Sequence, residues 1–497
     1  MGKFTNFNNY LKTKILDDVN SGDEVFYVWV GKNEFWEDNQ APPESFSLED
    51  SELNIRNDML FGKKITNNEI GLLVNKYDWE SNTAYAMYDH RDKELFSKKF
   101  YVLNSSNNVY KCLDNNFGNP STIEPVFISN TAVELADGYK WKYLYTLDSQ
   151  TSLKFSTSNE IPITPNTDIQ TSAVPGSIET IVLENQGENY ITFHEGTIQE
   201  IVANNMFRIE NTASSSNNFY NKSGFYISSG PGSGVVTEIE SYFANNSGRY
   251  VKTKENITAS TSSNYIISPK VTITGDGENA TAYSVVNPET YVIDKIKMIN
   301  SGEQYTIATS TIEANNFYGS GAVSIPIISP ISGHGSDLQK ELNCEKIVFS
   351  MDFDGDEISS IPTDINVGQM GLLISPKNYS NNDIYSEPIF TQIVRFSQNL
   401  IASTPFQENE IIIGNTSGAM AKVVSGNTST TAVTMISGDF VETETVIGQN
   451  SSVSGQIFSI SSRDIDKYSG EILFYDNIDT LERSEESKET FKLIVKL

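Results

Sequence analysis

The alternation of apolar and polar residues predicts a chain built mainly from β-strands. "EVFYVWVG", which ends at Gly31, is a β-branched and aromatic run, and the runs "NEIGLLV", "KKFYVLN", "NVYKCLD" and "YKWKYLYTL" follow it. The start of the chain departs from this pattern, because apolar residues in 7–20 recur at helical spacing and Gly22 ends that segment. A second helix is predicted after the proline turn in "APPES".

Two segments near the end of the chain repeat one pattern at an offset of 34 residues: "FQENEIIIGNTSGAMAKV" and "FVETETVIGQNSSVSGQI". The matching pairs are Phe406 and Phe440, Glu408 and Glu442, Glu410 and Glu444, Ile413–Gly414 and Ile447–Gly448, and Ser417 and Ser451. A catalytic site is assembled once from converging groups, whereas paired β-units bury each other's apolar faces. The repeat therefore favours a paired β structure.

A second repeat has an offset of 115 residues. "IETIVLENQGENY" from Ile178 matches "IDKIKMINSGEQY" from Ile293, and each copy alternates apolar and polar residues before it breaks at Asn-x-Gly. This predicts a strand followed by a tight turn in which glycine supplies the positive φ. Each copy has a second half, "SPKVTITGDGENATAYSVV" or "TSTIEANNFYGSGAVSIPII". Residues 191–264 separate the halves of the first copy and are predicted to form a β insertion at a loop tip.

These patterns predict several domains in a chain of 497 residues. The predicted parts are 1–165 (N-terminal part of a core domain), 175–335 (inserted β repeat domain), 336–399 (core continuation), 400–462 (inserted tandem β repeat) and 463–497 (C-terminal strands returning to the core). The proline-rich stretch 159–177 reads as a linker. The expected fold is mainly β with a few N-terminal helices, in which sandwich-like or barrel-like β modules are inserted in an α+β core.

Composition narrows the function classes. The formal charge of −29 argues against nucleic-acid binding, which depends on Lys and Arg releasing counterions from phosphates. The most apolar run, 25–30, is too short to cross a bilayer, so no membrane insertion is expected. The N-terminus lacks the apolar core of a signal peptide. Cys112 and Cys344 are too few for a disulfide framework, and we expect two buried thiols in a protein made in a reducing compartment.

Candidate chemistry is sparse. The only histidines are His90, His194 and His334, and no catalytic motif surrounds them. His334, in "SGHGSD", is expected to serve a turn. "MDFDGDE" places Asp352, Asp354 and Asp356 on alternate positions, as in a calcium loop, but its glycine stands in the wrong place and no Glu follows at the twelfth position. A hairpin tip is favoured there, and the sequence predicts no catalytic residue, no metal and no cofactor.

Several short motifs resemble the baseplate wedge protein that T4-like contractile-tailed phages encode as the product of gene eight. These are "VFYVWVGKNEFWEDNQAPPES", "VNKYDWESNTAY", "VYKCLDNN", "DGYKWKYLYTL", "YSGEILFYDN" and the closing "ETFKLIVKL". They occur in the family's order and cover roughly 20–165, 344–380 and 466–497, under half of the chain. The repeat-bearing segments 175–335 and 400–462 look like insertions relative to that family.

The resemblance implies a non-enzymatic virion protein of the tail baseplate, made in the host cytoplasm. It would assemble with other baseplate wedge proteins as a homodimer within the wedge, and take part in baseplate rearrangement at host attachment. The suspected structural or interface anchors in the shared motifs are Trp36, Pro42, Pro43, Trp79, Tyr110, Asp137, Tyr139, Trp141, Tyr143 and Gly470. Aromatics are enriched both in cores and at assembly contacts, and core packing is the favoured interpretation.

Two other functions compete with this hypothesis. Polar β repeats rich in Tyr and Asn are compatible with a receptor- or glycan-binding tail protein. A β-solenoid enzyme that degrades polysaccharides is disfavoured, because solenoids need many short equal repeats and each repeat here occurs twice.

One strand is predicted to have an aromatic face and a basic face. Its aromatic residues Tyr139, Trp141 and Tyr143 alternate with Lys140 and Lys142, and successive side chains of a strand point to opposite faces.

Overall fold

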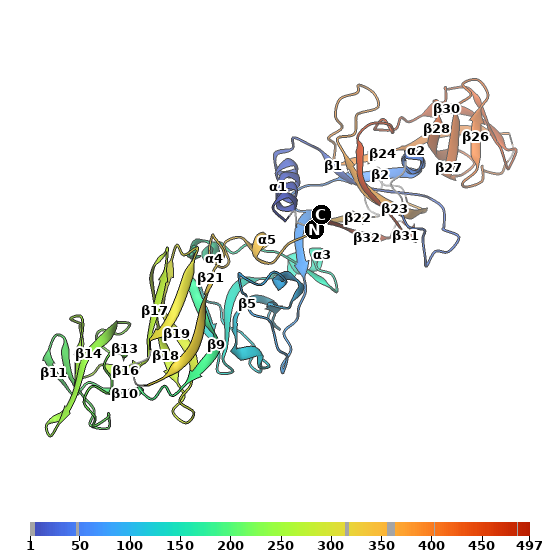
Figure 1. Cartoon of the computed structure of the whole chain (residues 1–497). Helices are drawn as coiled ribbons and strands as arrows, with labels where there is room; N and C mark the ends of the chain where they lie inside the picture. The colour runs from blue at the N-terminus through green and yellow to red at the C-terminus, as the bar shows by residue number, and fades with distance from the viewer. Residues whose placement is uncertain (1–4, 46–48, 314–317, 355–362, 402, 485) are drawn as a thin grey trace. The chain divides into compact units, whose positions relative to one another are not determined.

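The protein is mainly β and forms two compact units (Figure 1). The computed structural model describes residues 5–45, 49–313, 318–354, 363–401, 403–484 and 486–497. Strands make up 47% of the chain and helices 9%, which confirms the predicted fold class. Unit 1 comprises Met1–Leu73, Thr151–Thr157 and Glu345–Leu497, and unit 2 comprises Val74–Gln150 and Ser158–Cys344. The boundaries between the units fall within β3 (Ile70–Asn75) and α3 (Ser149–Phe155), among other positions.

The first sheet of unit 1 joins the beginning of the chain to strands from its last third. In spatial order its strands are β24 (Ile389–Thr391), β2 (Met59–Lys64), β1 (Phe26–Gly31), β23 (Ile365–Ile374) and β31 (Glu471–Arg483). Every residue of β1 is buried. A strand that is covered on both faces needs a continuous apolar run, which explains the sequence of this segment. Helices α1 (Thr5–Ser21) and α2 (Glu49–Asp58) belong to the same unit and match the two predicted N-terminal helices.

A second sheet of unit 1 contains the last strand of the chain. β32 (Lys488–Lys496) pairs with β22 (Lys346–Asp354) along its whole length, and β22 also pairs with residues 70–73 of β3. Leu73, Phe155 and Val348 form a small buried cluster beside this sheet. The N-terminal and C-terminal segments of the chain therefore share one folded unit, because β22 pairs with β3 on one side and with β32 on the other.

The 34-residue repeat forms a closed six-stranded barrel in unit 1. In ring order its strands are β25 (Ile393–Leu400), β28 (Thr430–Ser437), β27 (Met420–Gly426), β26 (Ile411–Gly414), β29 (Thr445–Gly448) and β30 (Ser454–Ile460). This order is symmetric under exchange of the copies, because β25, β26 and β27 of one copy correspond to β28, β29 and β30 of the other. Phe406 and Phe440 both lie in the barrel core.

The repeated Glu, Gly and Ser positions form one reciprocal device. Glu410 accepts hydrogen bonds from the backbone N–H groups of Asn450 (3.1 Å) and Ser451 (3.0 Å) and from the Ser451 hydroxyl (2.8 Å). In the same way, Glu444 accepts from the N–H groups of Thr416 (3.1 Å) and Ser417 (2.9 Å) and from the Ser417 hydroxyl (2.9 Å). Each copy therefore closes the turn of the other.

The repeated glycines make room for these carboxylates. A Cβ at Gly414 would lie 2.7 Å from an oxygen of Glu444, and a Cβ at Gly448 would lie 2.6 Å from an oxygen of Glu410. Real Cβ atoms do not approach oxygen so closely, so a side chain at either position would displace the carboxylate. The "I-G-x-x-S" pattern in each copy thus forms the turn that binds the glutamate carboxylate of the other copy.

Unit 2 contains the sheet that holds four of the ten suspected anchors. In spatial order its strands are β4 (Tyr101–Leu103), β5 (Asn108–Asn115), β7 (Tyr139–Thr146) and β6 (Val133–Glu134). Short elements accompany it: η1 (Leu95–Ser97), η2 (Asn116–Gly118), α4 (Thr167–Thr171) and α5 (Leu338–Glu341). β8 (Glu160–Pro162) is instead the edge strand next to β3 in the sheet of order β32-β22-β3-β8. Ile169 of α4 packs in the same cluster as Tyr110 and Trp141. The prediction of a linker over 159–177 is therefore wrong, because this stretch contains β8 and α4 and contributes a buried residue to the core.

The 115-residue repeat builds a second structure in which the copies exchange strands. The strands are β9 (Ile178–Glu188), β17 (Lys270–Gly275), β18 (Glu278–Val286), β19 (Ile293–Glu303), β20 (Ala308–Glu313) and β21 (Ser320–Ile328). The first half of one copy pairs with the second half of the other, as β9 with β21 and β19 with β18, while β17 pairs with β20. The shared Asn-x-Gly turns hold Gly187 at φ +64° and Gly302 at φ +62°, as predicted.

The β insertion between the halves of the first copy has its own core. Its strands are β10 (His194–Thr197), β11 (Glu200–Ala203), β12 (Met206–Ile209), β13 (Gly224–Ser229), β14 (Val236–Asn245), β15 (Gly248–Thr253) and β16 (Asn264–Ser268), which form one seven-stranded sheet. Phe207, Phe225, Tyr242 and Tyr265 are among its buried side chains. The insertion can therefore bury its own apolar residues.

The units divide the chain differently from the predicted domains. Residues 74–150, predicted as part of the 1–165 core, belong to unit 2 with the repeats of 175–335. The barrel extends from 393 to 460, so its first strand begins before the predicted boundary at 400, and it is assigned to unit 1. The reason for the first difference is contact between distant segments, such as the buried ion pair of Lys111 with Glu341, which local composition does not reveal.

Replacing Glu410 by Gln should loosen the turn of the opposite repeat. Gln presents one carbonyl oxygen where Glu presents two, so part of the charge-assisted bonding to Asn450 and Ser451 is lost, at a cost of about 1.5–3 kcal/mol. We expect hydrogen exchange in residues 445–455 to accelerate by roughly ten- to a hundredfold, since about 1.4 kcal/mol is a factor of ten. Exchange measured by mass spectrometry checks this.

Glu408→Gln is the matched control, because Glu408 is exposed and stands two residues away. Hydrogen-exchange rates that are equal in the Glu410→Gln and Glu408→Gln variants would contradict the reciprocal device.

The barrel should also lose stability in acid. Burial opposes the charge of Glu410, but bonds from Ser451, Gln407 and Asn450 outweigh it and lower the pKa of this carboxyl. The stabilisation is present above the ordinary Glu pKa of about 4.3 and disappears as pH falls through the lowered value. Thermal unfolding of the barrel, measured at a series of pH values below 5, checks this loss of stability.

Candidate functional site

Four suspected anchors lie in the core of the β4-β5-β7-β6 sheet. Tyr110, Tyr139, Trp141 and Tyr143 are all at most 2% exposed. The rings of Tyr139 and Trp141 stack with centroids 5.6 Å apart, and Tyr85 meets Trp141 edge-on at 5.7 Å. These residues therefore hold the sheet together and do not form a contact surface, in agreement with the favoured core interpretation.

Asp137 organises the loop before this sheet. Its Oδ2 atom accepts hydrogen bonds from the Ser121 hydroxyl (3.1 Å) and from the backbone N–H groups of Thr122 (2.9 Å) and Ile123 (3.0 Å). Trp79, which is half-buried, donates from Nε1 to the same Ser121 hydroxyl at 3.3 Å. Two of the shared motifs thus meet at one serine that no motif contains.

The anchor Trp36 fixes the segment after β1 in unit 1. Its Nε1 atom donates to the backbone carbonyls of Ile478 (3.0 Å) and Gly368 (3.3 Å). The ammonium group of Lys32 lies 4.4 Å from the centroid of the Trp36 ring. Residues from three distant parts of the chain therefore converge on this side chain.

The remaining anchors also have structural roles. Pro42 is half-buried and Pro43 is exposed, and the Pro43 carbonyl accepts a hydrogen bond from Asn477 Nδ2 at 2.8 Å. Gly470 adopts φ +69°, a conformation that favours glycine, and its carbonyl accepts from Arg56 Nη2 at 2.9 Å. Of Pro42, Pro43 and Gly470, only Pro43 is exposed to solvent.

The opposite face of β5 and β7 carries the predicted lysines, but it is covered. Lys142 is 6% exposed and Lys111 is fully buried. Lys140 lies 3.5 Å from the carboxylate of Glu179 on β9, and Lys111 forms an ion pair with Glu341 of α5. The strand has one aromatic and one basic face as predicted, and neither is open to a large partner.

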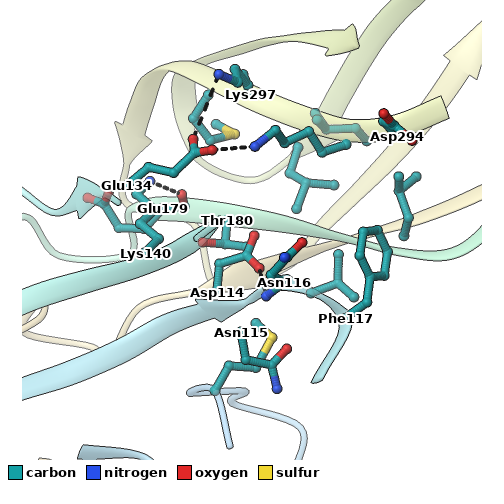
Figure 2. A pocket seen from close by; sticks show the side chains of 18 of the residues that line it. Asp114, Asn115, Asn116, Phe117, Glu134, Lys140, Glu179, Thr180, Asp294 and Lys297 are labelled. Carbon is teal, nitrogen blue, oxygen red and sulfur yellow. Dashed lines mark hydrogen bonds and ion pairs between the residues drawn. The ribbon is translucent and has the colours of Figure 1, made fainter. Parts of the chain in front are cut away.

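A groove runs between this sheet and the repeat structure of unit 2 (Figure 2). It encloses about 720 Å³ and is lined by residues 114–117, by 134–140 and by the outer sides of β9 and β19. Ile181 and Leu183 of β9 belong to the repeat core, and together with Thr180 and Val182 they border the groove.

Most charges in the groove are paired with each other. Figure 2 shows Glu134 between two ammonium groups: it forms an ion pair with Lys295 and lies 3.9 Å from Lys297. Lys140 is paired with Glu179 across the groove. These pairs join the sheet to β9 and β19, and they leave little net charge for an ionic ligand.

Three further groups border the groove. Asp114 is partly buried, and burial raises the pKa of its carboxyl despite a bond from the Asn116 N–H. The Thr180 hydroxyl is buried and has no hydrogen-bond partner among the described residues. Phe117 is 58% exposed and has φ 59°, a left-handed conformation that is rare for a bulky residue. Sequence patterns gave no signal for any of them, apart from the motif that contains Asp114.

The three histidines lie apart and have separate partners. His90 Nδ1 accepts from the Ile328 N–H at 3.2 Å, and His194 Nδ1 lies 3.0 Å from the Tyr265 hydroxyl. His334 lies in a turn, as predicted, but it is 4% exposed and does not present its ring on the surface. Among the described residues, no group of three or more His, Cys, Asp or Glu is arranged to hold a metal ion.

The alternating aspartates are tied into unit 1. Asp352 accepts a hydrogen bond from Thr490 of the neighbouring strand, and Asp354 lies 3.4 Å from Lys488. Asp356 and the glycine before it lie outside the described residues, so the predicted hairpin tip stays a prediction. Cys112 and Cys344 are both free and buried, as expected. In the part of the chain that the structure describes, no helix is long and apolar enough to cross a membrane.

No protein-family model matches the chain, and the search of curated proteins found no match to its sequence.

Replacing Asp137 by Ala should destabilise unit 2. The change removes the acceptor for two backbone N–H groups and the Ser121 hydroxyl, which we expect to cost about 1–3 kcal/mol. Urea unfolding followed by tryptophan fluorescence checks this, because Trp79 contacts the same serine. Glu188→Ala, which removes an exposed carboxylate of the same unit, should leave the midpoint unchanged. An unshifted midpoint for Asp137→Ala would contradict the role of Asp137.

Proposed function

We propose that the protein is a structural subunit of a contractile phage tail baseplate wedge. It would assemble through contacts with other wedge proteins, without catalysis and without a cofactor. The proposal starts from the resemblance of the motifs that contain Trp36, Trp79, Tyr110, Asp137 and Gly470 to the gene-eight wedge family. A homodimer within the wedge and a part in baseplate rearrangement at host attachment rest on the same resemblance.

One observation supports the proposal most directly: the motif residues are parts of the framework. Tyr110 and Trp141 form the core of one sheet, Asp137 closes its loop, and Trp36 ties β1 to a strand near the C-terminus. Residues that two proteins share for a common scaffold should occupy such positions, whereas residues shared for a common reaction should converge on a cleft. The repeats are then additions to that scaffold.

The surface of unit 2 offers a rigid site for a partner. Residues 124–129 lie beside the sheet without regular secondary structure, and Pro125 and Phe127 accept hydrogen bonds from Asn104 (2.7 Å) and Tyr110 (2.6 Å). The side chains of Val126 and Ile128 are 64% and 70% exposed. Exposed apolar side chains on a segment held by such hydrogen bonds suit docking of another protein.

The location of the protein in its virion tests the proposal. We expect gold-labelled antibodies raised against the purified chain to bind the distal end of the contractile tail, at the baseplate. Particles assembled with Val126→Asp and Ile128→Asp together should incorporate less of the protein, because two buried charges would oppose docking. Labelling of the capsid or tail sheath alone, or absence from the virion, would contradict the baseplate assignment.

The groove favours a second candidate function, that of a glycan-binding tail protein. An exposed aromatic ring, an unpartnered hydroxyl and a carboxyl suit a sugar, which presents C–H groups on one face and hydroxyls at its edge. The paired charges around Glu134 and Glu179 suit a neutral ligand. Phe117, Thr180 and Asp114 would supply the contacts.

A panel of bacterial surface glycans tests this alternative. If the groove binds sugar, Thr180→Val should weaken binding of the best glycan about five- to tenfold, since one hydrogen bond contributes about 1 kcal/mol. Phe117→Ala should weaken it further. Phe35→Ala is the control, because Phe35 is a similarly exposed ring, 59%, in unit 1. Absence of binding to the panel, or equal loss in all three variants, would refute the alternative.

A further inference from the structure

A buried charged cluster joins the central strand of the unit 2 sheet to the end of that unit. Lys111 of β5 forms an ion pair with Glu341 of α5, and their side chains are 0% and 1% exposed. The ring of His334 lies beside them, edge-on to Tyr88 with centroids 4.9 Å apart. The Lys111 ammonium also lies 4.8 Å from the centroid of the Tyr88 ring.

The ion pair is costly as a pair of charges. Removing an ammonium and a carboxylate from water carries a large desolvation penalty, which can exceed the energy of their attraction. Burial lowers the pKa of Lys111, although Glu341 opposes this shift. A neutral amine and a neutral carboxylic acid, which differ from the ion pair by the transfer of one proton, do not carry this penalty.

The carboxyl group of Glu341 is already polarised on one side. Its Oε1 atom accepts hydrogen bonds from the backbone N–H groups of Gly335 (2.6 Å) and Asp337 (3.4 Å). Backbone donors fixed in this way stabilise the negative oxygen of a tetrahedral intermediate without reorganisation. The other oxygen, Oε2, faces Lys111.

His334 stands where a proton carrier would be needed. Its Nδ1 atom lies 3.9 Å from Glu341 Oε2 and has no hydrogen-bond partner among the described residues. Burial lowers the pKa of this imidazole, and the charges of Lys111 and Lys142 lower it further. A neutral imidazole can accept a proton and return it, as a general acid–base catalyst does.

We propose that Lys111 and Glu341 form an intramolecular amide crosslink. After proton transfer, the lone pair of Lys111 Nζ attacks Cδ of Glu341, and Oε1 takes the negative charge beneath the two backbone donors. His334 accepts a proton from Nζ and delivers it to Oε2, the C–Oε2 bond breaks, and one water molecule leaves. The carbonyl re-forms on Oε1, and no oxidant or other reactant is required.

The released water has an outlet. His334 and Lys142 line a second cavity of unit 2, of about 520 Å³, which also borders Asn130 and Ser172. Loss of water to bulk solvent favours the amide, because the reverse reaction needs water in the dry site. Removal of two buried charges works in the same direction.

The crosslink would lie at a mechanically sensitive position. Glu341 precedes by a few residues the point after Cys344 where the chain leaves unit 2 for unit 1. Tension transmitted along the chain at this point would otherwise pull α5 and its loop from the unit. An amide to β5 would direct the load to the central sheet instead. This consequence rests on the proposed function, whereas the crosslink itself does not.

Intact-mass spectrometry of the purified full-length protein under denaturing conditions tests the proposal. We expect the mass to be lower than the sequence mass by one water molecule. Protease digestion should yield one branched peptide that contains both Lys111 and Glu341. A full sequence mass with separate Lys111 and Glu341 peptides would overturn the proposal, whatever the virion experiments show.

Matched variants identify the bond and the role of His334. The Lys111→Met variant should have the full mass calculated from its sequence, without the loss of one water molecule. Lys270→Met should leave the water loss unchanged, because Lys270 forms a half-exposed pair with Glu238 in the same unit. His334→Asn should slow the mass change by tenfold or more in protein that is produced unfolded, before the bond forms, and is then allowed to fold, since general acid–base catalysis contributes that much or more. Water loss that persists in Lys111→Met would also overturn the assignment.

Discussion

Pairing between strands that are far apart in the sequence is the constraint on which this structure depends. In either repeat, the strands of one copy have backbone N–H and C=O groups that find hydrogen-bond partners only in the other copy. In the 115-residue repeat, β9 finds its partner in β21 and β19 finds its partner in β18. In the barrel, Glu410 and Glu444 bind each other's turns. Neither copy is therefore a complete folding unit, which explains why each repeat occurs as a pair.

The same constraint organises the two units. Unit 1 closes by ladders between β1 and β23 and between β3 and β22, so its sheets need both halves of the chain. Unit 2 depends on the pair of Lys111 with Glu341 and on Ile169 in the core of the β5-β7 sheet. Long loops between such contacts slow folding more than they reduce stability. In the proposed baseplate role, such tight reciprocal contacts would help the protein to keep its shape.

The features that bear on function lie between these framework elements. The groove with Asp114, Thr180 and Phe117 forms where the sheet meets the repeat structure. The covered basic face and the buried cluster around Glu341 arise from that same packing within unit 2. The proposals on assembly, glycan binding and crosslinking thus all start from how modules inside one unit meet, and none starts from a single local motif.

The sequence alone determined the local structure. Alternation predicted β strands, helical spacing predicted α1, and Asn-x-Gly predicted turns with positive φ, because these signals depend only on neighbouring residues. It also marked Glu410, Gly414 and Ser417 with their matches as one repeated pattern. Only the tertiary structure decided that each Glu serves the opposite copy, that 74–150 joins unit 2, and that His334 and Thr180 are buried. Those facts arise from contacts between residues tens or hundreds of positions apart, for which a single sequence carries no local signal.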